Sequence, residues 1–177
     1  PLTPSPLGAG HAALAVELDR AHRDDGLDVV RLSPGFVYGP GGLFRSAFVD
    51  QAVKGRLRCI GPGHNYWSCI HVDDLAAGYA AALTGAAPGS SYAVVDDEPL
   101  TLREITDLVT VALGKGKVGT APAAVLGLLL GRPLVQSLVT SFRIRNTRLR
   151  TDLGWTPTRP RAREALPDSA RELAGRG

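Results

Sequence analysis

Methionine is absent from this sequence of 177 residues, and cysteine occurs only as Cys59 and Cys69. The two cysteines form neither a C-x-x-C motif nor a disulfide-rich framework, so a reducing, cytoplasmic location is expected. Long apolar runs are also missing. The most apolar stretch, residues 123–131, is far shorter than the roughly 20 residues of a membrane span. The proline-rich start carries no basic segment ahead of an apolar one, which argues against a secretory leader. These absences predict a soluble protein without a membrane partner.

Strong net charge is missing as well, because 20 basic and 17 acidic residues leave a charge of +3. This excess is too small to indicate nucleic-acid binding. It is concentrated locally, in a segment whose only acid is Asp152 and whose basic residues are Arg143, Arg145, Arg148, Arg150, Arg159, Arg161 and Arg163. We interpret this segment either as a solvated basic helical region or as a site for an anionic substrate or partner. No interleaved aromatic residues support a nucleic-acid partner.

Composition and periodicity predict a single α/β domain over residues 1–177, because 44% of the residues are hydrophobic and 21% are charged. Apolar periodicity predicts helices over about residues 9–23, 44–54 and 102–112, and one after Pro122. Strands are expected over residues 27–32, 57–60, 68–72 and 91–95. Thr101 and Glu104 have the spacing of a capping box, and Asp73 or Asp74 is expected to cap a helix that continues through Leu83.

One glycine motif imitates a dinucleotide site. Gly8-Ala9-Gly10-His11-Ala12-Ala13 matches the G-x-G-x-x-A fingerprint, in which backbone amides at a helix start bind a pyrophosphate. That fingerprint follows a buried strand, whereas residues 1–7 contain three prolines. The next strand candidate also runs into Ser33 instead of an acidic residue. We therefore expect no bound cofactor, and no metal site is expected either.

Four later segments resemble the extended short-chain dehydrogenases/reductases, the NAD-dependent epimerase/dehydratase family. They are the strand and V-Y-G-P loop over residues 29–42, the H-V-D-D-L-A segment at 71–76, the late strand and T-x-x-E helix over 92–113, and L-G-W-T-P at 153–157. Their order and spacing are those of the family, from about residue 4 to residue 160. The resemblance implies a truncated Rossmann-like short-chain dehydrogenase fold, namely the C-terminal, substrate-binding half without the complete nucleotide-binding half.

The same resemblance implies that the family's redox machinery is missing. The family's S-P-Y-G-x-x-K motif falls on residues 5–11, which places Leu7 at the catalytic tyrosine and His11 at the lysine. Leucine cannot transfer a proton, so standard NAD(P)-dependent dehydrogenase activity is not expected. Trp67 stands where members that act on nucleotide sugars carry an arginine that binds the diphosphate, so such substrates are not expected unless Arg143 or Arg145 takes the place of that arginine.

The candidate catalytic residues are His11 and Tyr38. A histidine with an unperturbed pKa near 6.5 suits proton transfer at neutral pH, and the resemblance places Tyr38 in a loop that faces the site. Phe36, Tyr66 and Trp67 are candidates for binding an apolar small-molecule substrate. The alternatives are a solvated or capping His11 and aromatic residues that belong to the core. His71, Asp73 and Asp74 are interpreted as structural.

Three functions stay open at this point. The first, which we favour, is a cofactor-independent isomerase, lyase or cyclase that acts on an apolar small molecule. The second is the C-terminal subunit of a split NAD(P)-dependent oxidoreductase or epimerase, with a separate chain as its Rossmann half. The third is a non-catalytic binding remnant. Self-association into a homo-oligomer is expected in each case, because the family's Tyr-x-x-x-Lys helix commonly joins a dimer interface.

Overall fold

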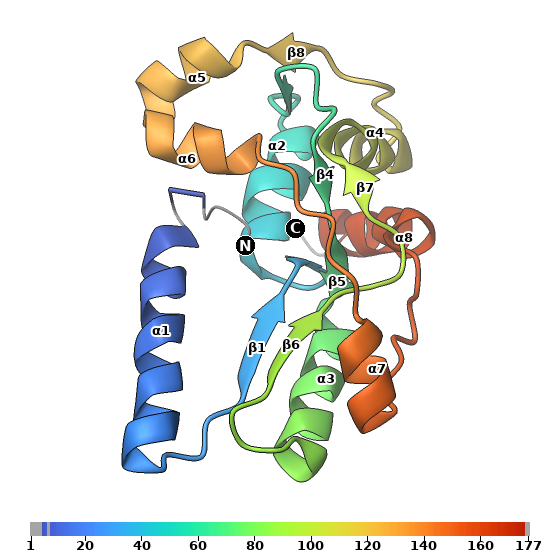
Figure 1. Ribbon diagram of the computed structural model, residues 1–177. Helices are drawn as coiled ribbons and strands as arrows, with labels where there is room; N and C mark the ends of the chain where they lie inside the picture. The colour runs from blue at the N-terminus through green and yellow to red at the C-terminus, as the bar shows by residue number, and fades with distance from the viewer. Residues whose placement is uncertain (1–4, 7, 176–177) are drawn as a thin grey trace.

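Helices and strands alternate along the chain in the structure, a computed structural model that describes residues 5–6 and 8–175 (Figure 1). The helical elements are α1 (Gly8–Asp25), the π-helix η1 (Phe44–Val49), α2 (Asp50–Val53), α3 (Val72–Gly85), α4 (Leu102–Ala112), α5 (Ala123–Leu130), α6 (Arg132–Leu138), α7 (Thr147–Leu153) and α8 (Ala162–Gly175). The strands are β1 (Arg31–Pro34), β2 (Phe36–Tyr38), β3 (Cys59–Ile60), β4 (Tyr66–Trp67), β5 (Cys69–His71), β6 (Ser91–Val94), β7 (Leu100–Thr101) and β8 (Thr120–Ala121). This order confirms the α/β class.

The strands pair mainly in parallel. β1 pairs with β6, β2 with β5 and β3 with β8 in parallel register, while β4 and β7 are antiparallel. The chain changes partners at Gly35, whose N–H donates to the Val94 carbonyl at 3.1 Å, before the Phe36 N–H donates to the Ser68 carbonyl at 2.8 Å. A Cβ at Gly35 would lie 2.3 Å from the Ser68 oxygen, so this crossing requires glycine.

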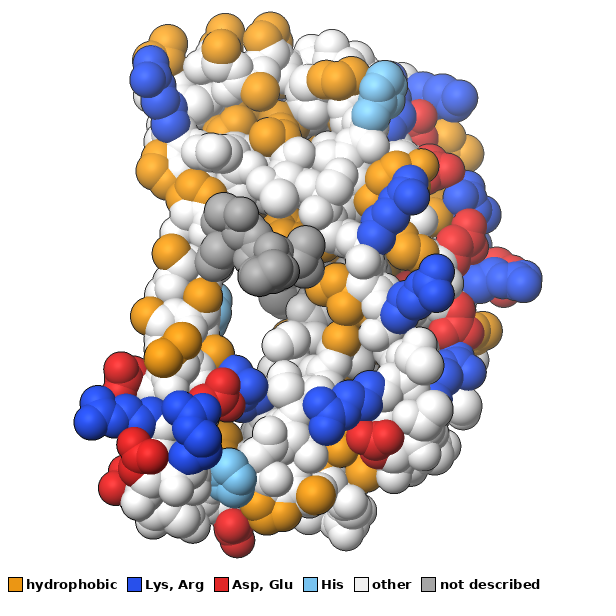
Figure 2. Space-filling view, in the orientation of Figure 1, with side chains coloured by type: hydrophobic (Ala, Val, Ile, Leu, Met, Phe, Trp, Pro, Cys, Tyr) orange, Lys and Arg blue, Asp and Glu red, His pale blue; other side chains and the backbone are white. Residues whose placement is uncertain are grey.

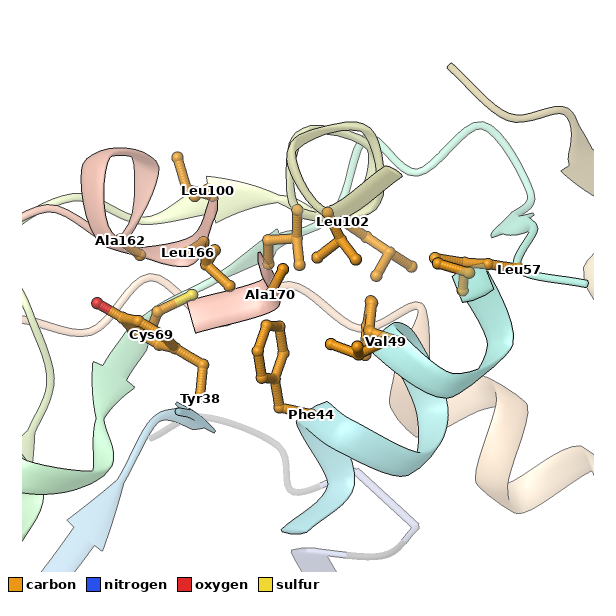
Figure 3. Close-up of a cluster of buried hydrophobic side chains, with 14 of the residues drawn as sticks. Tyr38, Phe44, Val49, Leu57, Cys69, Leu100, Leu102, Ala162, Leu166 and Ala170 are labelled. Atoms are coloured by element: carbon orange, nitrogen blue, oxygen red, sulfur yellow. The ribbon is translucent and has the colours of Figure 1, made fainter. Parts of the chain in front are cut away.

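Two clusters of buried side chains hold these elements together. The larger cluster joins η1, α4 and α8 to β2 and β5, and Figure 3 shows Phe44, Leu102 and Leu166 converging in it. The smaller cluster packs Trp155 and Leu149 of the C-terminal segment against β6. Helix α1 contributes no buried residue, and in the space-filling view an opening separates part of it from the rest of the molecule (Figure 2).

Local signals in the sequence are confirmed where their partners are close along the chain. The capping box forms as expected, because the Thr101 hydroxyl accepts from the Glu104 N–H at 3.1 Å and the Glu104 carboxylate accepts from the Thr101 N–H at 2.8 Å. The first helix also forms and is followed by Gly26 at φ 68°. No helix within the described ranges is both long and apolar enough to cross a bilayer.

Three expectations are wrong in detail. The expected strand over residues 27–32 begins only at Arg31, where pairing with β6 starts. The helix expected over residues 44–54 begins as a π-helix and becomes α-helical only at Asp50. Helix α3 is capped by neither Asp73 nor Asp74. Its N-cap is the extended residue His71, whose Nδ1 accepts from the Asp73 N–H at 3.2 Å.

Candidate functional site

The last part of the chain runs back along β4 and carries polar side chains with it. The Phe142 N–H donates to the Tyr66 carbonyl at 2.6 Å, and the Ser68 N–H donates to the Phe142 carbonyl at 3.0 Å. The Ser68 hydroxyl also accepts from the Ile144 N–H at 2.9 Å. These bonds fix residues 142–144 beside β4, so Arg143 and its neighbours are held against the loop that follows β6.

A groove of about 520 Å³ lies between that segment and that loop, and its lining consists of Tyr66, Asp96, Asp97, Pro99, Arg143, Ile144, Arg145, Asn146 and Thr147. The Arg143 guanidinium carbon lies 3.5 Å from the centre of the Tyr66 ring, which is close enough for a cation–π contact. This volume is in the range of small-molecule sites.

The arginines of the basic segment fall into two groups. Arg148, Arg150, Arg159, Arg161 and Arg163 each pair with a carboxylate, at distances from 2.6 to 3.3 Å. Within the part of the chain that the structure describes, Arg143 and Arg145 form no ion pair. The two guanidinium groups without a carboxylate partner are therefore the two that line the groove.

The two carboxyl groups of the groove have different environments. Asp97 accepts two hydrogen bonds of 2.6 Å from Arg150 and one of 2.9 Å from the Asn146 amide. Asp96 is 3% exposed, and its Oδ2 accepts from the Ala162 N–H at 2.9 Å. Asp96 Oδ1 has no hydrogen-bond partner among the described residues. Burial raises the pKa of the Asp96 carboxyl from 3.8 to about 7, so both of its protonation states are populated near neutral pH.

The residues predicted as an apolar binding wall separate in the structure. Phe36 and Trp67 pack on each other with ring centres 4.9 Å apart, and both also contact Phe48. Trp67 is buried, so this pair belongs to the core. Tyr66 is the predicted residue that lines the groove, beneath Arg143.

The two predicted catalytic residues are also in different environments. Tyr38 is 1% exposed, and its ring meets the His71 ring edge-on with 5.2 Å between centres. Its hydroxyl has no hydrogen-bond partner in the described part of the chain, and burial, assisted by Asp96, raises its pKa. His11 is exposed on α1, and no side-chain hydrogen bond or ion pair joins its imidazole to another described residue. Its role in proton transfer stays a prediction, and Leu7 lies outside the described residues.

His71, Asp73 and Asp74 have structural roles, as expected. Asp74 is buried, and its carboxylate accepts from the Thr158 N–H at 2.8 Å, the Thr158 hydroxyl at 2.6 Å and the Arg159 N–H at 3.0 Å. Asp73 lies outside this buried contact and pairs with Arg159 at 3.3 Å. Asp74 therefore anchors the segment that leads into α8.

The residues that line the groove on the β6 side were missed by sequence reasoning. Asp96 and Asp97 follow a predicted strand, which is a common position for ligand-binding side chains. Nothing in the sequence distinguishes the carboxyl that Arg150 neutralises from the carboxyl that stays buried without a cation.

The glycine motif at the start of α1 differs in geometry from the turn that binds a pyrophosphate. Gly8 and Gly10 lie in the first turns of α1, with helical backbone, instead of in a turn that wraps a phosphate. A Cβ at Gly10 would meet nothing within 4 Å, so no close approach requires a glycine there. Histidine, cysteine and acidic side chains also do not cluster as metal ligands anywhere in the described part.

Comparison with known proteins connects this fold to larger enzymes, although no family model matches the chain. A 3-diazoavenalumate denitrifying reductase from Streptomyces sp is 33% identical over 165 residues, which are 92% of this chain and 54% of that protein. A 2-alkyl-3-oxoalkanoate reductase from Stenotrophomonas maltophilia is 30% identical over 119 residues, 64% of this chain and 36% of that protein. The chain thus spans about half the length, or less, of the curated relatives that it matches.

The solved structures that this chain matches are also about twice its length, so the chain covers about half of each. DesIV, a dTDP-glucose 4,6-dehydratase from Streptomyces venezuelae whose structure holds NAD and TYD, superposes with a TM-score of 0.79 at 26% identity, over 97% of this chain and 52% of that one. A dTDP-glucose 4,6-dehydratase from Bacillus anthracis in complex with NAD gives a TM-score of 0.82 at 18% identity, over 100% of this chain and 54% of that one.

Proposed function

We propose that this chain, which belongs to the extended short-chain dehydrogenase/reductase family, binds a small organic acid between Arg143 and Arg145 and supports a non-redox reaction of that acid. The observation that carries the proposal is the pairing pattern of the arginines. Five guanidinium groups of the segment are neutralised by carboxylates, and the two that are not line one groove.

An anionic ligand fits this arrangement better than an apolar one. Two guanidinium groups can supply charge-assisted hydrogen bonds to a carboxylate or a phosphate. Phe36 and Trp67, which suggested an apolar substrate, pack against each other and against Phe48. An organic acid therefore replaces the apolar substrate in our proposal.

The curated relatives support this substrate class. Both are named for reactions of acids, one for an avenalumate and the other for an oxoalkanoate. The first relative, at 33% identity, aligns with 92% of this chain, and this alignment includes the segments that form the groove here. The second relative, at 30% identity, aligns with a smaller part of the chain. We extend only the anionic character of these ligands to the present protein.

The reaction class follows from the titratable groups at the site. Asp97 is held by Arg150, whereas Asp96 has no cationic partner and a pKa of about 7, so Asp96 is the carboxyl suited to exchanging a proton near neutral pH. The lysine of the family's Tyr-x-x-x-Lys pair is replaced by His11. Isomerisation, elimination or cyclisation of the bound acid needs positioning and proton transfer, and it needs no hydride donor.

A second candidate function is the substrate-binding side of an NAD(P)-dependent reductase whose nucleotide-binding half comes from elsewhere. The curated relatives favour it, since both are reductases of about twice the matched length or more. The two functions share the groove and differ in hydride transfer. Reduction of a keto acid by NADPH, after addition of a nucleotide-binding half, would identify the second.

Isothermal titration with benzoate tests the proposed groove, and benzamide serves as a neutral ligand of the same shape. Arg143→Gln and Arg145→Gln are each expected to weaken benzoate binding about tenfold, because a hydrogen bond to a charged group is worth about 1.5–3 kcal/mol. Arg148→Gln is the matched control, because Arg148 pairs with Asp152 outside the groove. Equal binding of benzoate and benzamide, or equal losses in all three variants, would contradict the proposal.

A further inference from the structure

A second group of cations lacks carboxylate partners, on loops that contribute no residue to the organic-acid groove. Beyond Arg143 and Arg145, the lysines and arginines without an ion pair in the described part are Arg23, Arg132 and a set of five, which we name the basic rim: Lys54, Arg56, Arg58, Lys115 and Lys117. The rim comes from two short loops, one after α2 and the other after α4. Unpaired cations are therefore concentrated at this place.

The two loops border an open groove of about 450 Å³, whose lining consists of Ala52, Gly55, Leu57, Arg58, Thr110, Lys115, Lys117, Val118 and Gly119. Parallel pairing of β3 with β8 holds the loops together, and the Cys59 N–H donates to the Gly119 carbonyl at 3.1 Å. The Arg58 guanidinium is fixed in place, because its Nη1 donates to the carbonyls of Gly55 at 3.1 Å and Leu57 at 2.7 Å. One cation of the rim is thus preorganised.

Backbone geometry adds further donors beside the lysines. Gly114 and Gly116, on either side of Lys115, have φ values of 70° and 66°, so the chain turns sharply around this lysine. The N–H groups of Gly114 and Lys115 are used by the carbonyls of α4, whereas those of Gly116 and Lys117 have no acceptor among the described residues. Turns with a left-handed residue present successive N–H groups as a concave anion site.

We propose that the basic rim is a second binding site, which takes a small molecule bearing a phosphate or pyrophosphate group. The cations, the unused N–H groups and the volume of the groove each favour a compact, multiply charged anion. No carboxylate lines the groove to repel it. The site is independent of the organic-acid groove, because no residue is shared between the two linings.

The size and lining of the groove favour a small molecule over a polymer. No aromatic side chain lines it, so it offers no surface on which nucleotide bases could stack. The buried side chains of Ala52 and Leu57 form an apolar floor, and the Thr110 hydroxyl donates to the carbonyls of Thr106 and Asp107 at 3.1 and 3.2 Å. The Thr110 hydroxyl hydrogen is therefore used within α4, and the charge of the site comes from the rim.

Inorganic pyrophosphate is the probe for this site, and a protein carrying Arg143→Gln and Arg145→Gln is the starting point, because these changes remove the charge of the other groove. Titration calorimetry at low ionic strength is expected to show one pyrophosphate bound per chain. Adding Lys115→Gln and Lys117→Gln should weaken binding at least tenfold, and adding Arg23→Gln, an unpaired cation on α1, should leave it unchanged. Amide shifts of Gly116 and Lys117 in nuclear magnetic resonance spectra should follow the same titration.

Several outcomes would overturn the proposal. Loss of pyrophosphate binding already in the starting protein would assign the anion to the Arg143–Arg145 groove. Equal effects of the lysine pair and Arg23→Gln would show nonspecific attraction. Tighter binding of a single-stranded oligonucleotide or of polyglutamate than of pyrophosphate, with the same dependence on the lysines, would identify a macromolecular partner instead. Failure of benzoate to bind the wild-type protein would affect only the organic-acid groove.

Discussion

Replacing Asp74 with alanine should destabilise the protein severely, because this carboxylate connects two distant parts of the chain. Asp74 is 2% exposed and accepts three hydrogen bonds from Thr158 and Arg159, 84 and 85 residues away. Its removal takes the acceptor away from two N–H groups and one hydroxyl, beside a position that is buried. A hydrogen bond to a charged group is worth about 1.5–3 kcal/mol, so loss of the three together should cost about 3 kcal/mol or more, which for a chain of this length corresponds to a fall in Tm of about 10 °C.

Urea unfolding followed by tryptophan fluorescence measures this loss, because Trp155 is buried three positions before Thr158. The matched control is Asp73→Ala, whose side chain is 66% exposed and pairs with Arg159 and His71 across 3.3 and 3.5 Å. It should cost less than about 1 kcal/mol. The reasoning would be refuted if Asp74→Ala cost under 1 kcal/mol, or no more than Asp73→Ala.

Four further changes are expected to alter the free energy of unfolding in predictable directions. Gly35→Ala should cost about 2–4 kcal/mol through the contact with the Ser68 carbonyl, while Gly10→Ala, inside α1 with open space around it, should stabilise by up to about 1 kcal/mol; comparison of their urea midpoints checks both. Thr101→Ala removes the N-cap of α4 and should cost about 1–2 kcal/mol, measured in the same way. Asp96→Asn should stabilise the protein by up to about 4 kcal/mol at pH 8 and hardly at all at pH 4, because the native carboxyl, with its pKa raised from 3.8 to about 7, resists the ionisation that occurs freely in the unfolded chain. Stability curves that run parallel between these pH values would contradict this expectation.

The fold could be predicted largely because its signals are local or patterned. The capping box depends on residues three positions apart, and helix α1 begins and ends within about two residues of the expected limits. Four segments of the sequence indicated the extended short-chain dehydrogenase family. The family and the Rossmann-like α/β fold are confirmed. The expected cap at Asp73 or Asp74 is wrong because the helix begins earlier: His71, two residues before Asp73, has the extended backbone of an N-cap, and its Nδ1 accepts from the Asp73 N–H.

The site was less accessible to sequence reasoning because it depends on pairings between distant residues. Asp96 is held by the Ala162 N–H, 66 residues away, and Arg150 is neutralised by Asp97, 53 residues away. The sequence showed a run of arginines and offered an anion site as one interpretation. Only the three-dimensional pairing separates Arg143 and Arg145 from the arginines that are already neutralised.

The aromatic residues illustrate the same limit. A sequence shows that Phe36 and Trp67 are large and apolar, but it does not show whether a ligand or other side chains cover them. Strands β2 and β4 bring the two rings together and η1 supplies Phe48 to the same cluster, so the apolar surface is satisfied internally. Tyr66, on the neighbouring position of β4, points to the groove instead, as expected for alternate residues of a strand.

The most direct test of the organic-acid site is a crystal structure of the chain grown or soaked with benzoate. We predict that the benzoate carboxylate lies within hydrogen-bond distance of the guanidinium groups of Arg143 and Arg145, in the groove beside Tyr66 and Asp96. Benzoate bound against Phe36 and Trp67, or at no site when the solution titration shows binding, would contradict the assignment of the substrate to this groove.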